Sequence, residues 1–198
     1  MNALRATNAT KAIKGLRMGL LATVLATGLG AAVPAHAALD VGDKAPDFSA
    51  DAALAGKPFR FSLAEALARG PVVLYFFPAA FSDDCSIEAH AFAEAMPQFR
   101  ALGATVIGVS GDDIATLGKF STQACQGRFP VAADSGLAIV KSYQAAMTTR
   151  PDYANRISYV IAPGGTIAYQ YTSLNPARHV EKTLAALRAW RDSAPPAK

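Results

Sequence analysis

Two continuous runs of apolar residues lie in the middle of the chain, and each predicts a strand buried on both faces of a sheet. The first is PVVLYFF at residues 71–77, and the second is ATVIGVS at residues 104–110. Runs of β-branched and aromatic residues without polar alternation are typical of central strands. Between them, residues 86–103 predict an amphipathic helix, bent at Pro97 and ended by Gly103. Its apolar face consists of Ile87, Ala91, Phe92, Ala95, Phe99 and Leu102.

The rest of the chain alternates between strands and helices in the same way. An opening loop leads to a short hairpin around residues 56–62, and Ser62 then caps one or two helical turns. After the second buried strand the pattern predicts a helix at 111–125, an extended piece at 129–134, a short helix at 136–144 and a loop at 145–155. A hairpin at 156–173, which turns at Gly164-Gly165, and a helix at 175–190, which is capped by Asn175, complete the chain.

This order of elements predicts the fold class. Strands and helices that alternate as β-α-β-α and end in β-β-α form an α/β domain of three layers around a central mixed sheet. That is the thioredoxin-like order, here with an N-terminal extension. A chain of 198 residues is long enough for one such domain with a well-buried core. The fold class alone does not determine a function.

Residues 1–37 have a pattern of their own, which predicts a secretory signal peptide. A basic stretch ends at Arg17, an apolar run follows, and the small residues Ala35 and Ala37 flank His36. We expect cleavage after Ala37, export to the periplasm, and one domain over residues 38–198. The alternative is a single membrane anchor, because the basic stretch is long for a signal peptide.

The net positive charge of the chain comes from residues 1–37. The formal net charge is +4, and the first 37 residues hold four basic residues and no acidic ones. The remaining chain is therefore neutral, and we expect neither nucleic acid nor a stable membrane association. With 52% hydrophobic and 17% charged residues, the composition is that of a globular protein.

A candidate for chemistry follows the first buried strand, in the segment PAAFSDDC at residues 78–85. Cys85 is predicted in the first turn of a helix that begins near Ser82, where free N–H groups and the helix dipole favour the reactive thiolate. The alternative is an ordinary buried cysteine, with Ser82 as a routine cap. Neither a metal site nor a cofactor is expected, because only Cys125, His90 and His179 could join Cys85 as zinc ligands after residue 37.

These residues carry a resemblance to a known family. Pro78-x-x-x-Ser82-x-x-Cys85 resembles the P-x-x-x-[T/S]-x-x-C signature of the peroxiredoxins. The segments GDKAPDF, VVLYFFP, VIGVSGD and RISYVIAPGGTI resemble other parts of the family. NPARHVEKTLAAL is most similar to the Q-type branch, also called bacterioferritin comigratory proteins. The resemblance implies a thiol-dependent peroxidase that reduces hydrogen peroxide and organic hydroperoxides.

The resemblance also implies a role for each residue of the motif. Cys85 would be the peroxidatic nucleophile, and Ser82 would hydrogen-bond the thiolate or the peroxide. Pro78 would screen the pocket from water. Arg156 would stabilise the thiolate and bind the peroxide, and Glu88 would orient that arginine.

The sequence departs from the family in two places. Asp83 and Asp84 are negative charges beside the nucleophile and disfavour a thiolate unless their side chains point outward. His90 stands where Q-type relatives often have a resolving cysteine, and we expect it at the surface. The other cysteine is Cys125, near the end of the next helix, where some Q-type relatives place theirs. It would resolve Cys85 through an intramolecular disulfide; the alternative is an inert Cys125 and an external thiol.

The implied partners are a peroxide and a thioredoxin-like or other thiol reductant, and we expect a monomer or a weak dimer. Two other functions stay open at this point. One is an exported thioredoxin-like thiol–disulfide protein, although such proteins need a C-x-x-C pair and Ser82 and Glu88 flank Cys85 here. The other is a non-enzymatic domain held by a structural disulfide between Cys85 and Cys125.

Overall fold

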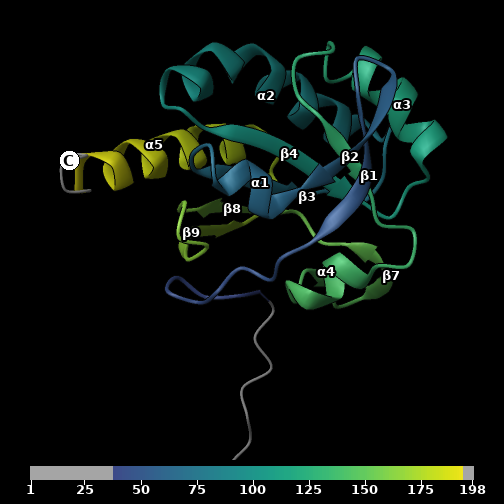
Figure 1. The fold of residues 1–198 in the computed structure, drawn as a ribbon. Helices are drawn as coiled ribbons and strands as arrows, with labels where there is room; N and C mark the ends of the chain where they lie inside the picture. The colour runs from purple at the N-terminus through teal and green to yellow at the C-terminus, as the bar shows by residue number, and fades with distance from the viewer. Residues whose placement is uncertain (1–37, 194–198) are drawn as a thin grey trace, which may run out of the picture. The chain divides into compact units, whose positions relative to one another are not determined.

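The computed structural model describes residues 38–193, so the predicted signal peptide lies outside the described residues. Figure 1 shows helices packed on both sides of a twisted sheet. The elements are β1 (Ser49–Leu54), β2 (Lys57–Ser62), α1 (Leu63–Leu67), β3 (Val72–Phe76), α2 (Asp83–Ala101), β4 (Thr105–Ser110), α3 (Ile114–Gln123), β5 (Val131–Ala133), α4 (Ala138–Ser142), β6 (Ala146–Met147), β7 (Arg150–Ala154), β8 (Ile157–Ile161), β9 (Ile167–Thr172) and α5 (Ala177–Ser193).

The central sheet is mixed, as the sequence predicts. Its strand order is β2-β1-β5-β4-β3-β8-β9. β3 runs parallel to β4 and antiparallel to β8, and β4 runs parallel to β5. The β1–β2 hairpin adds to the sheet at β5 in an antiparallel sense, so the N-terminal extension becomes one edge of the sheet.

The alternation of side chains along β3 divides the hydrophobic core into two parts. Leu74 faces one side, together with side chains of α1 and α4. Tyr75 faces the other side, together with side chains of α2, α3 and α5. Because successive strand residues point to opposite faces, a strand between two helical layers must be apolar throughout. The predicted three-layer architecture is confirmed.

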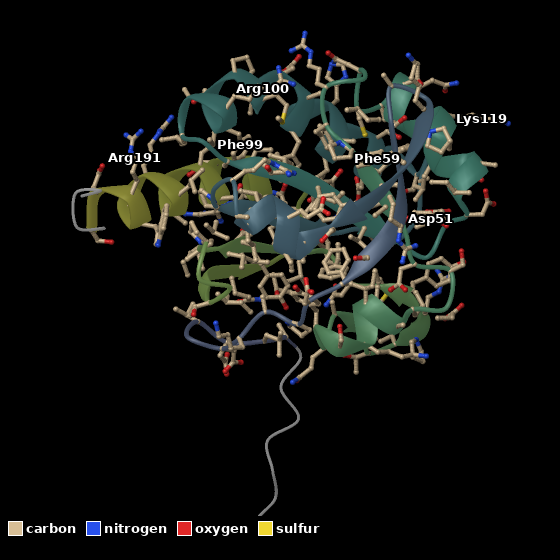
Figure 2. The ribbon with its side chains drawn as sticks, in the orientation of Figure 1. Asp51, Phe59, Phe99, Arg100, Lys119 and Arg191 are labelled. Atoms are coloured by element: carbon tan, nitrogen blue, oxygen red, sulfur yellow. The ribbon has the colours of Figure 1, made fainter. Side chains whose placement is uncertain are left out.

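Helix α2 packs one face on the sheet, but the predicted apolar face is only partly correct: Phe92, Ala95 and Phe99 are buried, whereas Ile87 is 53% exposed. Phe99 is fully buried, whereas its neighbour Arg100 is exposed at the outer surface (Figure 2). The helix continues past Pro97 to Ala101. The predicted caps are also present elsewhere: the Ser62 hydroxyl accepts a hydrogen bond from the Glu65 amide at 3.3 Å, at the start of α1.

The predicted loop at residues 145–155 is wrong. This segment contains β6 and β7, which pair as a separate antiparallel ribbon. β7 is mostly exposed, and the Arg150 guanidinium lies 3.8 Å from the centre of the Tyr153 ring. A ribbon that buries so little needs no apolar alternation, so its sequence resembles a loop.

Two helix ends also differ from the prediction. Helix α3 ends at Gln123, so Cys125 lies beyond the helix rather than inside it. Helix α5 begins at Ala177, whose amide donates to the Asn175 side chain at 3.0 Å, and it continues to Ser193.

Candidate active site

The buried strand β3 leads directly to Cys85. Pro78 follows the strand, Phe81 has a φ of 64°, and α2 begins at Asp83 with Ser82 as the N-cap residue. Cys85 therefore lies in the first turn of α2, as predicted, and its exposed fraction is 1%. In this position the free N–H groups of the first turn and the positive end of the helix dipole lie near the thiol.

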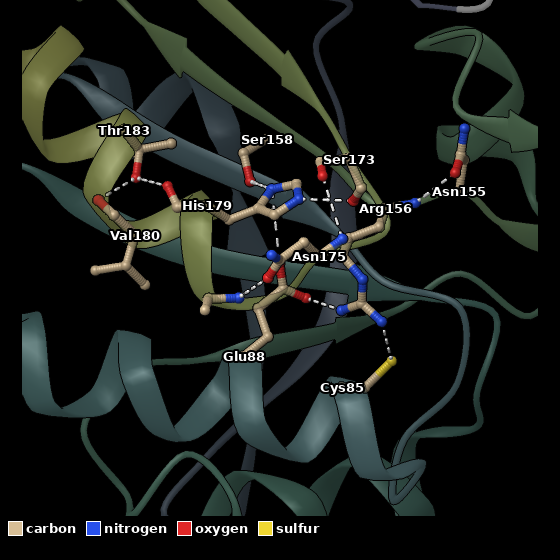
Figure 3. Close-up of polar contacts among 11 residues, drawn as sticks. Cys85, Glu88, Asn155, Arg156, Ser158, Ser173, Asn175, His179, Val180 and Thr183 are labelled. Atoms are coloured by element: carbon tan, nitrogen blue, oxygen red, sulfur yellow. Dashed lines mark hydrogen bonds and ion pairs between the residues drawn. The ribbon is translucent and has the colours of Figure 1, made fainter.

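Arg156 contacts this cysteine because of the register between β3 and β8. Phe76 at the end of β3 is paired with Ile157 at the start of β8, so Arg156 lies just beyond the end of the buried strand. The residue is 3% exposed, and its guanidinium donates from Nη2 to Cys85 Sγ at 3.4 Å (Figure 3). A positive charge at this distance favours the thiolate.

Glu88 follows Cys85 by one turn of α2 and is fully buried. Its Oε2 accepts a hydrogen bond from Arg156 Nη1, so the guanidinium bridges Glu88 and Cys85. Burial raises the pKa of Glu88 to about 8, and the charge of Arg156 opposes that rise. The arrangement is the one expected for a residue that orients the arginine.

The sequence analysis missed a further pair of buried polar residues behind Glu88. His179 on α5 lies with Nδ1 2.8 Å from Ser158 Oγ, and its Nε2 is 2.9 Å from the carbonyl oxygen of Ser173. Burial lowers the pKa of His179 to about 4. One signal was available: Arg156 and Ser158 are two residues apart at the start of a strand, so they point to the same face.

The predicted role of Ser82 is not reflected in its hydrogen bonds. Its hydroxyl donates to the carbonyl oxygen of Ala79 at 3.0 Å, and the residue is exposed. The predicted bond to the thiol is not present among the described contacts, because the tight turn before α2 offers this nearer backbone acceptor. Asp83 and Asp84 are exposed, so water screens their charges.

A shallow cavity of about 430 Å³ opens over the arginine. Its lining consists of Pro78, Ser82, Asp83, Asp84, Arg156 and Leu174. Pro78 is half-buried at the edge of this cavity, where its ring can limit access of water. A small substrate that enters here meets the guanidinium that holds Cys85.

Cys125 is fully buried, and burial raises its pKa. It lies two residues beyond α3, and both cysteines are free thiols in the same apolar core. His90 is exposed on α2, where it lies 3.4 Å from Glu94 and contacts Gln126, as expected of a surface residue.

Residues 38–193 contain no group of three or more potential metal ligands. Within the same residues, no helix is long and apolar enough to cross a membrane.

A cysteine in the first turn of a helix, hydrogen-bonded by a buried arginine on a mixed sheet of thioredoxin-like order, defines a thiol-reactive protein of the thioredoxin-like superfamily. Residues 41–170 match the model of the AhpC/TSA family. The chain therefore belongs to the AhpC/TSA family, and its relatives place it among the Q-type peroxiredoxins.

The sequence relatives carry peroxiredoxin names. The chloroplastic peroxiredoxin Q of Oryza sativa subsp. japonica is 32% identical over 120 residues, which cover 60% of this chain and 55% of the rice protein. YkuU of Bacillus subtilis (strain 168), named as a peroxiredoxin, is 34% identical over 158 residues, which cover 75% of this chain and 87% of YkuU. The chain spans about half the length of the plant relatives it matches.

Solved structures agree with this assignment. The crystal structure of peroxidoxin BcpB from Mycobacterium tuberculosis superposes with a TM-score of 0.67 at 28% identity, over 76% of this chain and 97% of that one. The PrxQ structure from Xylella fastidiosa has the same fold, with a TM-score of 0.68 at 24% identity, over 77% of this chain and 98% of that one.

Proposed function

We propose that this protein is a thiol-dependent peroxidase in which Cys85 attacks hydrogen peroxide or an organic hydroperoxide. The observation that carries the proposal is the hydrogen bond from buried Arg156 Nη2 to Cys85 Sγ at 3.4 Å. Together with the N-terminal end of α2, this contact favours a thiolate, which is the nucleophilic form of cysteine. Family membership supports the same activity.

The proposed reaction uses the groups around the cavity. The thiolate sulfur attacks one peroxide oxygen; the S–O bond forms as the O–O bond breaks. Sulfur is oxidised to a sulfenic acid, and the peroxide is reduced to water or an alcohol after its leaving oxygen takes a proton from solvent. Arg156 lines the cavity, so its charge also lies where negative charge develops on the leaving oxygen.

Stopped-flow mixing of the reduced full chain with one equivalent of hydrogen peroxide tests this proposal. We expect rapid, stoichiometric loss of peroxide with conversion of Cys85 to its sulfenic acid or a disulfide, detected by mass spectrometry. The Cys85→Ser variant is the control and should consume none. Slow, sub-stoichiometric consumption by the reduced chain would overturn the proposal.

We further propose that Cys125 resolves the sulfenic acid of Cys85. Loss of water between the two would form an intramolecular disulfide, which a thioredoxin-like or other thiol reductant would then reduce. Both thiols are buried, so the ends of α2 and α3 must open locally for the sulfurs to meet. A thiol–disulfide carrier has less support, because such proteins use a C-x-x-C pair. Glu88 stands where the second cysteine of that pair would be, and it hydrogen-bonds Arg156.

We also propose that the protein is exported to the periplasm. The support is the pattern of residues 1–37, with its basic start, apolar run and small residues before Ala38. Sequencing the N-terminus of protein released by osmotic shock tests this proposal, and Ala38 is the expected first residue. Recovery of the full-length chain in the membrane fraction would instead favour an anchor.

A further inference from the structure

Glu88 uses only one of its two carboxyl oxygens in a hydrogen bond. Oε2 accepts from Arg156, whereas Oε1 is buried and has no hydrogen-bond partner among the described residues. A buried unpaired oxygen costs free energy and needs an explanation. The polar atom that faces it is His179 Nδ1 on α5, at 3.6 Å (Figure 3).

The hydrogen bonds of His179 determine where its ring proton lies. Nε2 faces the Ser173 carbonyl oxygen at 2.9 Å, and a carbonyl can only accept, so the proton of the neutral ring lies on Nε2. Nδ1 then carries a lone pair, which accepts from the Ser158 hydroxyl at 2.8 Å. A carboxylate oxygen at Glu88 Oε1 would be repelled by this electron-rich nitrogen at 3.6 Å, whereas a neutral carboxylic acid would not be.

The charges of the site lead to the same conclusion. Arg156 is the one cation that contacts Cys85 among the described residues, and it also contacts Glu88. If Cys85 were a thiolate and Glu88 a carboxylate, two buried anions would share one guanidinium. A net buried charge is costly. A proton on Glu88 leaves the charge of Arg156 to the thiolate.

We propose that His179 is a positioning residue that stabilises a proton on Glu88 Oε1 and thereby keeps the charge of Arg156 available to the Cys85 thiolate. The inference rests on the proposed function only in taking Cys85 as the reactive thiol. His179 touches neither Cys85 nor the substrate cavity; it acts through Glu88.

The charged and titratable groups around the pair support this assignment. Burial, and to a smaller extent the nearby charge of Asp84, raises the pKa of Glu88 to about 8 against the opposing effect of Arg156. Burial and the charge of Arg156 lower the pKa of His179 to about 4. At neutral pH the proton therefore belongs to the carboxyl group rather than to the imidazole.

Aromatic residues of two further strands surround the pair. Tyr171 of β9 packs the edge of its ring against His179, with 4.9 Å between the ring centres. Tyr75 of β3 is fully buried on the same face of the sheet, and burial raises its pKa, so it stays neutral. Neither tyrosine supplies a compensating positive charge for a carboxylate at Glu88.

Alkylation of Cys85 by iodoacetamide across a range of pH tests the inference without peroxide. In the full chain, His179→Asn replaces the acceptor at Nδ1 with an amide that can donate to Glu88, which stabilises the carboxylate. We expect alkylation at neutral pH to slow about tenfold and its pH profile to move toward alkaline pH. Glu88→Gln is permanently uncharged and keeps an acceptor for Arg156, so it removes the ionisation through which His179 would act. The double variant should match Glu88→Gln.

Thr183→Val is the matched control. Thr183 is buried one turn further along α5 and donates to the His179 carbonyl oxygen at 2.7 Å, without contacting Glu88. It should keep the wild-type alkylation profile. An unchanged profile in folded His179→Asn, or an equal effect of that substitution in the Glu88→Gln background, would overturn the inference.

A second measurement does not depend on the stability of the His179 variant. The infrared spectrum of the reduced wild type at neutral pH should contain the C=O stretch of a buried carboxylic acid, and Glu88→Gln should lack it. Absence of that band while Cys85 is a thiolate would overturn the inference. Failure of the wild type to reduce peroxide would instead count against the proposed function, because neither measurement uses peroxide.

Discussion

Arg156 connects the reactive cysteine to the rest of the site. Its planar guanidinium donates to Cys85 from one nitrogen and to Glu88 from another, a geometry that a lysine ammonium cannot reproduce. The side chain is almost fully buried, so its charge is screened little by water. We therefore expect this residue to have the largest effect on reactivity after Cys85 itself.

Arg156→Met should slow peroxide reduction about 10³-fold, because it removes the positive charge from both the thiolate and the leaving oxygen. Circular dichroism should show an intact fold, since methionine fills much of the same space. Stopped-flow rates measure the effect. Arg69→Met is the control, because Arg69 is exposed at the end of α1. A rate within a few fold of the wild type would remove Arg156 from the mechanism.

A local motif and the family resemblance led to the residues around Cys85, and neither could lead to the residues behind them. Cys85, Glu88 and Pro78 lie within a few positions of one another, and Arg156 was found through the family resemblance. His179 reaches Glu88 only after α5 has packed against α2, so no local pattern contains this contact. The motif specifies the residue type at Ser82 and not its rotamer, so it could not indicate that the hydroxyl donates to the Ala79 carbonyl oxygen; a bond from Ser82 to a peroxide stays a prediction.

Among the elements, the strands with continuous apolar runs were predicted correctly and the exposed ribbon was not. β3 and β4 are buried on both faces, so burial alone dictates their composition. β6 and β7 are held together by backbone pairing and by contacts such as that of Arg150 with Tyr153. Neither requires apolar and polar residues to alternate, so the sequence does not indicate these strands.

The pairing of β3 with β4 also explains a glycine. Tyr75 lies opposite Gly108, and a Cβ atom at Gly108 would stand 2.8 Å from the Tyr75 ring. Gly108→Ala should therefore lower the free energy of unfolding by about 1–3 kcal/mol, because a ring stacked on Phe92 cannot move freely. Urea unfolding measures this change. Gly164→Ala is the control, since nothing lies within 4 Å of its added methyl. Equal stability of the two variants would contradict the prediction.

The positions of the cysteines relative to their helices lead to another prediction. Cys125→Ser should still react once with peroxide, because Cys85 and Arg156 are unchanged. Turnover with a thioredoxin-type reductant should fall at least tenfold, since such a reductant attacks a disulfide. A coupled peroxidase assay measures turnover, and mass spectrometry should find a disulfide between Cys85 and Cys125 in the wild type alone. Undiminished turnover would make Cys125 a structural residue.

In the whole molecule, the site depends on elements that are distant in the sequence. Cys85 and Glu88 come from α2, Arg156 precedes β8, and His179 comes from α5. A hydrogen bond of 2.8 Å from Arg188 to Gln98 also joins α5 to α2. Folding of the C-terminal helix thus completes the network, and the ionisation of that network must contribute to the stability of the domain.

The two buried titratable groups affect stability in opposite directions. The pKa of Glu88 rises from 4.5 to about 8 on folding, so its contribution is full below pH 4.5 and is lost as the pH rises through 8. The pKa of His179 falls from 6.5 to about 4, so its contribution is full above pH 6.5 and is lost on acidification through 4. Between pH 4.5 and 6.5 the two slopes cancel.

We therefore expect the free energy of unfolding of the reduced wild type to be level from pH 4.5 to 6.5 and to fall toward pH 8. The fall should be about 2 kcal/mol, because over that interval the folded state holds about one proton more than the unfolded state. Glu88→Gln should not show this fall, and its stability should instead rise from pH 4.5 to 6.5, where only His179 titrates. Urea unfolding of both proteins at each pH measures the difference between the two curves, in which the contributions of ionisable groups distant from Glu88 cancel. Parallel curves would show that Glu88 does not hold its proton in the folded state.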